Sequence, residues 1–197
     1  VRNQLQNSDR NDQYQTVEFT VTKRSSGRWS ALASFWAVKY DAWLPSQTNP
    51  TIAGTLIPDD PNAAQNGRDE TWKWAGNFSG SYLMPWGIQF GAFIQSKIGV
   101  QGQRTNVFRA ADPDGGRALA QLATVGLRME PFGAQTGPAI NVVNLRASKS
   151  FLFGSGHRVE FDADLFNLLN SSSPITINFQ SGPTFGYATS VVPPRIA

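Results

Sequence analysis

Cysteine is absent from the 197 residues, and histidine occurs once, at His157. Without cysteine, the chain cannot be a disulfide-stapled scaffold, bind zinc through thiolates or use a cysteine nucleophile. A single histidine beside a Gly-rich turn gives almost no support to a histidine-dependent triad or zinc site. We therefore expect no catalytic, cofactor-binding or metal-binding residues, and we do not expect an enzyme.

Charged residues are also few, at 16% of the chain, and the formal net charge is only +3. Lys and Arg are scattered rather than clustered, so the basic patch typical of nucleic-acid-binding proteins is missing. No apolar run reaches the roughly 18 residues that a transmembrane helix needs. A transmembrane β-strand is not excluded, because its signal is an alternation that is weak in any one segment.

Glycine and proline occupy 18 and 12 positions, and aromatic residues make up 12% of the chain. Gly and Pro interrupt helices, so this composition favours short strands and turns. Residues 158–165 read Arg-Val-Glu-Phe-Asp-Ala-Asp-Leu, with apolar and charged side chains in strict alternation. Successive side chains of a strand point to opposite faces, so this strand has one apolar face and one ionic face.

Five more segments have strand patterns: 17–22, 29–40, 72–82, 88–95 and 143–148. Residues 29–40 carry apolar groups on both faces, so their outward face stays open, and a further short strand is expected near residues 175–179. The residues predicted to face lipid are Val17, Phe19, Val21, Trp74, Phe78, Phe90, Val143, Leu145, Val159, Phe161 and Leu165. Those predicted to face the lumen are Asn144, Arg146, Ser148, Glu160, Asp162 and Asp164.

Short and long connections alternate along the chain. Short turns are predicted at 24–27, 84–87 and 152–156, and long connections rich in Pro, Gly, Asn and Asp at 41–71, 98–140 and 167 onward. Compact soluble domains seldom repeat loops of that length. Outer-membrane barrels place short turns at one end and long loops at the other. The pattern predicts an all-β fold, an antiparallel up-and-down transmembrane β-barrel segment of about six to seven strands.

The length of the predicted strand 72–82 agrees with this interpretation. It spans roughly 33 Å at about 3.3 Å per residue. A tilt of about 45° reduces this to roughly 23 Å along the membrane normal, close to an apolar band of about 25 Å. The aromatic residues expected at the outer membrane interface are Trp36, Tyr40 and Trp43, and those expected at the inner one are Tyr82 and Trp86.

The turns also predict hairpin register. A tight turn at 152–156 pairs Val143 with Leu165, Leu145 with Ala163, Ala147 with Phe161, Arg146 with Asp162 and Ser148 with Glu160. The turn at 84–87 places Gly80 beside Phe90. A slip of one residue would move Asp162 into lipid, so the alternation constrains which face each residue takes.

Residues 161–170, "FDADLFNLLN", resemble the penultimate-strand motif of TonB-dependent outer-membrane receptors. Three further stretches extend the match: "VEFTVTKRSSGRWSALASF", "GRDETWKWAGNFSGSYLMPWGIQFGAFIQS" and "SGPTFGYATSVVPPRIA". Together, in this order and spacing, they resemble the C-terminal barrel portion of the Oar-like subgroup. The resemblance covers nearly the whole chain, and the long loops match least.

Membership in this family implies a 22-stranded barrel with a plugged lumen. Such a receptor lies in the outer membrane of a Gram-negative type of cell and takes up an unidentified nutrient ligand with energy supplied by a TonB complex. Its partners would be outer-membrane lipid, the TonB complex and that ligand, with no nucleic acid. A plug domain, a TonB box and a terminal aromatic strand are not seen.

Barrels of this kind need at least eight strands, in even number, and an open sheet edge in lipid is costly. We therefore expect residues 1–197 to be a partial C-terminal portion of the receptor barrel, cut at both ends. The alternative is a soluble extracellular β-sandwich, such as a carbohydrate-binding module with exposed Trp residues. A sandwich would bury the apolar faces of two sheets against each other.

Several local patterns have a functional and a structural interpretation. Glu160, Asp162 and Asp164 could be the paired carboxylates of a glycosidase, but a solvated lumen face is favoured. The stretch "DPDGG" at 112–116 is interpreted as a turn rather than a calcium loop, because later acidic ligands are missing. The row Trp72, Trp74, Phe78 and Tyr82 is expected to face lipid rather than sugar. Loop residues from Asp59 to Asp69 and from Arg104 to Arg117 are candidate ligand contacts by location alone.

Overall fold

The computed structural model describes residues 11–45, 48–50, 65–109, 119, 122–154 and 156–196. Within these residues every regular element is a β-strand, and every pairing between strands is antiparallel. The same part of the chain holds no helix with the length and apolar character needed to span a membrane. The predicted all-β class is confirmed.

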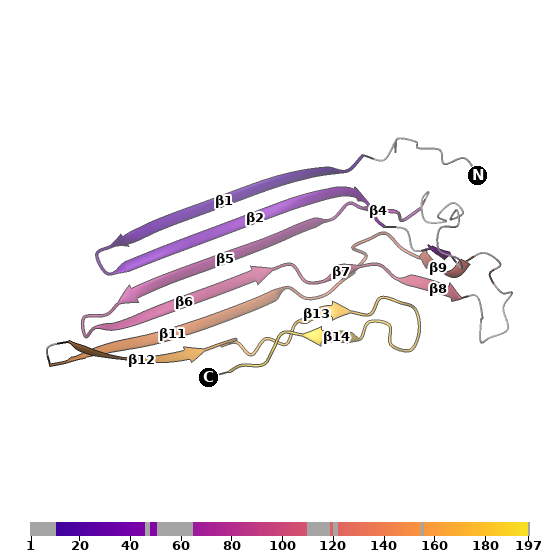
Figure 1. The fold of residues 1–197 in the computed structure, drawn as a ribbon. Helices are drawn as coiled ribbons and strands as arrows, with labels where there is room; N and C mark the ends of the chain where they lie inside the picture. The colour runs from indigo at the N-terminus through magenta and orange to yellow at the C-terminus, as the bar shows by residue number, and fades with distance from the viewer. Residues whose placement is uncertain are drawn as a thin grey trace.

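The main sheet is built from long strands and one short one. Their bounds are β1 Gln13–Ser26, β2 Trp29–Trp43, β4 Arg68–Asp69, β5 Trp72–Leu83, β6 Ile88–Lys97, β11 Ile140–Phe153 and β12 His157–Leu165. The long strands lie side by side in the order β1-β2-β5-β6-β11-β12, and β4 pairs with the end of β2 (Figure 1). Each long strand therefore runs opposite to the one before it.

Tight turns join the long strands at one end of the sheet. They connect β1 to β2, β5 to β6 and β11 to β12, at the left in Figure 1. Gly27, Gly87 and Gly154 take positive φ angles of 73°, 71° and 58° in these turns. Glycine carries no Cβ and adopts this backbone region without strain, so it supplies the reversal that each turn needs.

The long connections gather at the other end of the sheet and carry short strands of their own (Figure 1). These are β3 Thr48–Pro50, β7 Gln101–Gly102, β8 Thr105–Arg109, β9 Leu122–Arg128, β10 Gln135–Thr136, β13 Pro174–Ile177 and β14 Ala188–Val191. They form three small sheets, β3-β9-β8, β7-β10 and β13-β14. The short strand expected near residues 175–179 is present as β13, whereas the other small strands were not predicted.

The predicted register of the β11–β12 hairpin is wrong by two residues. Phe153 pairs with His157, so the connection spans residues 154–156 and both Gly154 and Gly156 have positive φ. All the predicted pairs change accordingly: Leu145 pairs with Leu165, Arg146 with Asp164, Ala147 with Ala163, Ser148 with Asp162 and Ser150 with Glu160. A shift of two residues keeps every side chain on its face, so the alternation could not have detected it.

The β5–β6 hairpin differs from its predicted register by the same amount. Gly80 lies opposite Ala92, and Phe90 lies opposite Tyr82. Met84 N–H donates to the carbonyl of Ile88 at 2.8 Å, and Gly87 N–H donates to the carbonyl of Met84 at 3.1 Å. This leaves a three-residue loop ending in a left-handed glycine, one of the common hairpin connections.

The main sheet has almost no core of its own. Among the described residues the buried apolar side chains are Ala42, Ala75, Ile140 and Val192, and no large side chain is fully buried. By contrast, Phe19, Val21 and Phe161 are 64%, 68% and 64% exposed. Within the described residues the sheet is not closed, because β1 and β12 each pair with a neighbouring strand on one side only.

Candidate ligand-facing wall and loop end

The strand pairings place all the predicted lipid-facing residues on one face of the main sheet, because directly paired residues of antiparallel strands share a face. Val17, Phe19 and Val21 lie beside Ala37, Phe35 and Ala33, which lie beside Trp74, Gly76 and Phe78. The face continues through Ile94 and Phe90 to Val143, Leu145 and Ala147, and on to Val159, Phe161, Ala163 and Leu165. We call this the apolar face. Contact with lipid stays a prediction.

The opposite face, which we call the polar face, holds the predicted lumen-facing residues Asn144, Arg146, Ser148, Glu160, Asp162 and Asp164. It also settles the open question about residues 29–40. Trp36 pairs with Glu18 and Ala75, and Tyr40 pairs with Tyr14, so both lie on the polar face. Neither therefore points out of the apolar face, as an aromatic belt at the membrane interface would require.

The apolar face has polar residues at its loop end and aromatic residues at its turn end. Toward the loops, Trp72 lies beside Lys39, and Lys39 lies beside Gln15. Toward the turns, Tyr82 lies between Trp29 and Phe90, and its place at the inner membrane interface stays a prediction. The apolar surface therefore reaches the turn end of the sheet, whereas Lys39 and Gln15 interrupt it toward the loop end.

Ion pairs line the polar face of β11 and β12. Arg146 donates two hydrogen bonds to Asp164, at 2.6 and 2.7 Å. Arg158 donates to Glu160 at 2.9 Å and to the hydroxyl of Ser150 at 2.7 Å. Arg146 was predicted to pair with Asp162, and the two-residue change in register gives it Asp164 instead. Glu160 and Asp164 therefore each have an arginine partner on the polar face.

Hydrogen bonds continue these polar contacts toward the other edge of the sheet. Gln95 donates its amide to Asn77 at 3.0 Å, and Ser30 and Ser81 lie 2.8 Å apart between their hydroxyl oxygens. Both contacts join neighbouring strands on the polar face. A surface of small hydroxyls, amides and paired charges suits contact with water.

Asp69 organises the loop end of the sheet. It is only 5% exposed, and its carboxylate accepts from the Thr71 N–H at 3.0 Å, the Thr71 hydroxyl at 2.6 Å and Lys73 at 2.8 Å. The Lys73 ammonium lies 3.7 Å from the centre of the Tyr40 ring. Asp69 fell within a predicted ligand-contact range, but its bonds assign it to holding β4, β5 and β2 together.

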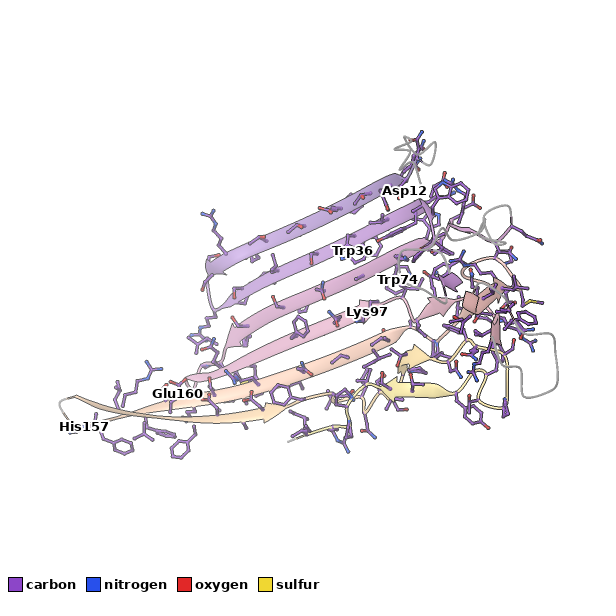
Figure 2. The ribbon with its side chains drawn as sticks, turned by 45° about the vertical axis from the view of Figure 1, so that its right-hand side comes forward. Asp12, Trp36, Trp74, Lys97, His157 and Glu160 are labelled. Atoms are coloured by element: carbon purple, nitrogen blue, oxygen red, sulfur yellow. The ribbon has the colours of Figure 1, made fainter. Side chains whose placement is uncertain are left out.

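Side-chain contacts of charged residues hold the loop end of the sheet in place. Figure 2 shows His157 and Glu160 at the turn end and Asp12 at the opposite end. At that opposite end the Trp43 N–H donates to Asp12 at 2.9 Å, and Arg68 forms an ion pair with Asp41. Arg68 also lies 4.9 Å from the centre of the Trp43 ring. The loop end therefore has several side-chain contacts that fix its conformation.

The remaining residues singled out from the sequence either lie outside the described residues or are exposed. Residues 59–64 and 110–117, including "DPDGG", lie outside the described residues. Arg104 is exposed, donates to the hydroxyl of Ser181 at 3.0 Å and lies 5.0 Å from the centre of the Phe185 ring. His157 is exposed at the start of β12. The described part of the chain contains no group of three or more His, Cys, Asp or Glu side chains able to hold a metal ion.

No protein-family model matches this chain, and no curated protein or solved structure matches it either.

Proposed function

We propose that this chain forms part of the barrel wall and extracellular loops of an outer-membrane TonB-dependent receptor that takes up an unidentified ligand. The observation that carries the proposal is the pair of faces on one antiparallel sheet. One face exposes a band of large apolar side chains, and the other carries ion pairs and amides. The strands of an outer-membrane barrel alternate in this way, with apolar residues toward lipid and polar residues toward the lumen.

Exposure of the apolar band in water would be unfavourable. Burying apolar surface stabilises a protein by about 25 cal/mol per Å², and a soluble monomer seldom exposes a continuous apolar patch larger than a few hundred Å². On this sheet the exposed apolar side chains run across every long strand, including Phe19 on β1, Phe78 on β5 and Phe161 on β12. A hydrocarbon environment removes this cost without any protein partner.

The arrangement of connections also supports the proposal. Turns of a few residues lie at one end of the sheet, and the connections with their own small sheets lie at the other (Figure 1). Outer-membrane barrels show this asymmetry, since their extracellular loops are long and their periplasmic turns short. The TonB complex and the plugged lumen enter through the sequence resemblance alone.

The alternative, a soluble β-sandwich, would need a second sheet on the apolar face. In the described part of the chain the small sheets are made by the long connections, and Phe19, Val21 and Phe161 keep more than half of their surface exposed. No observation specifically favours the sandwich.

Spin-label accessibility in native outer membranes tests the proposal. Cysteine can be introduced singly into this cysteine-free segment at each position from 17 to 22 and labelled with a nitroxide. Odd positions are expected to be more accessible to oxygen, which concentrates in lipid. Even positions are expected to be more accessible to a water-soluble nickel chelate.

Phe35 and Trp36 provide a matched pair, since both are aromatic neighbours on β2 but lie on opposite faces. Phe35→Cys should report lipid and Trp36→Cys should report water. The proposal fails if odd positions are shielded from both reagents, which is the result expected of a sandwich core, or if the protein fractionates away from the membrane.

A further inference from the structure

A pocket of about 370 Å³ lies among the long connections. Four stretches line it: Leu44 and Pro45 after β2, residues 101–105 around β7 and β8, Arg128 and Phe132 at and after the end of β9, and residues 178–180. Its volume lies at the lower end of the range of about 300–1,000 Å³ typical of small-molecule sites. None of its described lining residues lies in the long strands of the main sheet, so the pocket is separate from both the apolar face and the polar face.

Backbone hydrogen bonds fix the walls of this pocket. Thr105 N–H donates to the carbonyl of Phe179 at 3.0 Å, and Ser181 N–H donates to the carbonyl of Thr105 at 2.7 Å. Gly133 N–H donates to the carbonyl of Gly102 at 2.9 Å. These bonds join the stretches at 102–105, 133 and 179–181, so this part of the wall is held in place without a ligand.

Glycine at position 102 allows one aromatic wall of the pocket. A Cβ on Gly102 would collide with the ring of Phe179, so the ring packs directly on the backbone of β7. Phe132 lines the same pocket. The site therefore offers two phenyl rings as apolar surfaces for a ligand.

Gln103 is the polar group that points to a ligand. Its side chain is only 6% exposed and lines the pocket, and its Oε1 is buried with no hydrogen-bond partner in the part of the chain that the structure describes. Leaving a buried acceptor unsatisfied destabilises a protein by about 1–3 kcal/mol. A ligand hydroxyl or N–H, or an ordered water, would supply the missing donor.

The remaining lining residues define the class of that ligand. Gln101, Asn178 and Gln180 add amides and Thr105 adds a hydroxyl, whereas none of the described lining residues is a carboxylate or a lysine. Arg128, the charged residue among the described lining residues, is 7% exposed and donates to the carbonyl of Pro45. The described wall therefore brings one buried positive charge and no negative charge, which favours a neutral ligand over a cationic one. Amides both donate and accept hydrogen bonds, as ligand hydroxyls do.

We propose that this pocket binds one or two rings of a neutral saccharide, with a sugar hydroxyl donating to Gln103 Oε1 and the sugar's C–H faces against Phe132 and Phe179. This deepens the proposed function and rests on it, because the receptor interpretation places the pocket on the extracellular side. The function proposal leaves the ligand unidentified, and the pocket adds that the ligand is a neutral glycan.

The test is binding by the full-length protein, purified in detergent, to maltotetraose, cellotetraose and chitotetraose, with tetra-alanine as a peptide comparison. Titration calorimetry with the wild type should detect at least one of the saccharides. Gln103→Leu keeps the size of the side chain but removes its acceptor, so it should weaken that binding about tenfold or more. Gln89→Leu on β6 is the control, since Gln89 is exposed and lies outside the pocket.

A second readout separates a binding role from a structural one. Gln103→Leu removes an unsatisfied buried amide, so the ligand-free variant should unfold at the same or a higher temperature than the wild type. Phe179→Leu, which keeps the wall apolar but removes the ring, should weaken saccharide binding in the same direction. If Gln103→Leu fails to fold, this variant alone decides.

Three results would overturn the inference: no saccharide bound by the wild type, unchanged binding in the Gln103 and Phe179 variants, or binding of tetra-alanine alone. Failure of the receptor proposal is distinguishable. It appears in the spin-label pattern of β1, whereas the calorimetry in detergent does not depend on a membrane.

Discussion

At the loop end of the main sheet, single side chains hold neighbouring strands together through hydrogen bonds and ion pairs. Asp69 is the clearest case, because one buried carboxylate accepts from the backbone and hydroxyl of Thr71 and from Lys73. The Lys73 side chain remains 29% exposed, so solvent screens part of the ion pair. Loss of the carboxylate would leave the backbone N–H and the ammonium without their acceptor.

We predict that Asp69→Ala lowers the free energy of unfolding by about 2–3 kcal/mol, since one member of a mostly buried network is removed. The measurement is denaturant unfolding of the protein in detergent, followed by the fluorescence of its Trp residues. Glu70→Gln is the matched control, because the adjacent Glu70 side chain is 69% exposed. Equal effects of the two substitutions would contradict the role given to Asp69.

At the scale of elements, the sequence predicted faces better than registers. Alternation assigns each residue of β1, β5, β6, β11 and β12 to a face, and the pairings agree with one another across the whole sheet. Register within a face depends on where each turn begins. Both Gly154 and Gly156 have positive φ, so either glycine could have formed the turn. An alternation with a period of two residues does not indicate at which residue the turn begins.

Other features could not be read from the sequence because they depend on distant contacts. Residues 29–40 carry apolar groups on both faces, and only their pairing with β1 and β5 assigns Trp36 to the polar face. The pocket at Gln103 forms where three connections meet, and its short strands β7 and β10 have two residues each. Two residues are too few for any periodic signal.

The register of the β11–β12 hairpin gives a direct prediction. In an antiparallel pair, Cβ atoms directly opposite each other are about 4.5–5.5 Å apart, whereas diagonal neighbours are about 7–8 Å apart. Ser148 lies opposite Asp162. The double variant Ser148→Cys/Asp162→Cys should therefore form a disulfide under mild oxidation, because small movements reach the required geometry.

The comparison variant is Ser148→Cys/Glu160→Cys, which corresponds to the register predicted from the sequence. It should remain reduced, as measured by mass spectrometry of the intact protein after alkylation. Faster cross-linking of the second variant than of the first would show that the strands pair in the other register.

At the scale of the whole molecule, the two open edges of the main sheet raise the largest question. In the part of the chain that the structure describes, β1 pairs only with β2, and β12 pairs only with β11. Unpaired backbone groups in lipid cost several kcal/mol each, so an open edge cannot persist inside a membrane. An open edge in water is instead a template for association with other strands.

If the sheet is part of a closed barrel, its edge strands are covered by further strands in the full-length protein. We predict that the amides of β1 and β12 then exchange with solvent deuterium within about tenfold of the rate for β5 and β6, since all of them open only when the barrel does. The central strands β5 and β6 pair on both sides and serve as the internal reference. Exchange by mass spectrometry in detergent measures this. Edge strands that exchange far faster than the centre would mean that the sheet ends at β1 and β12. The apolar face would then have to be covered by something other than a membrane.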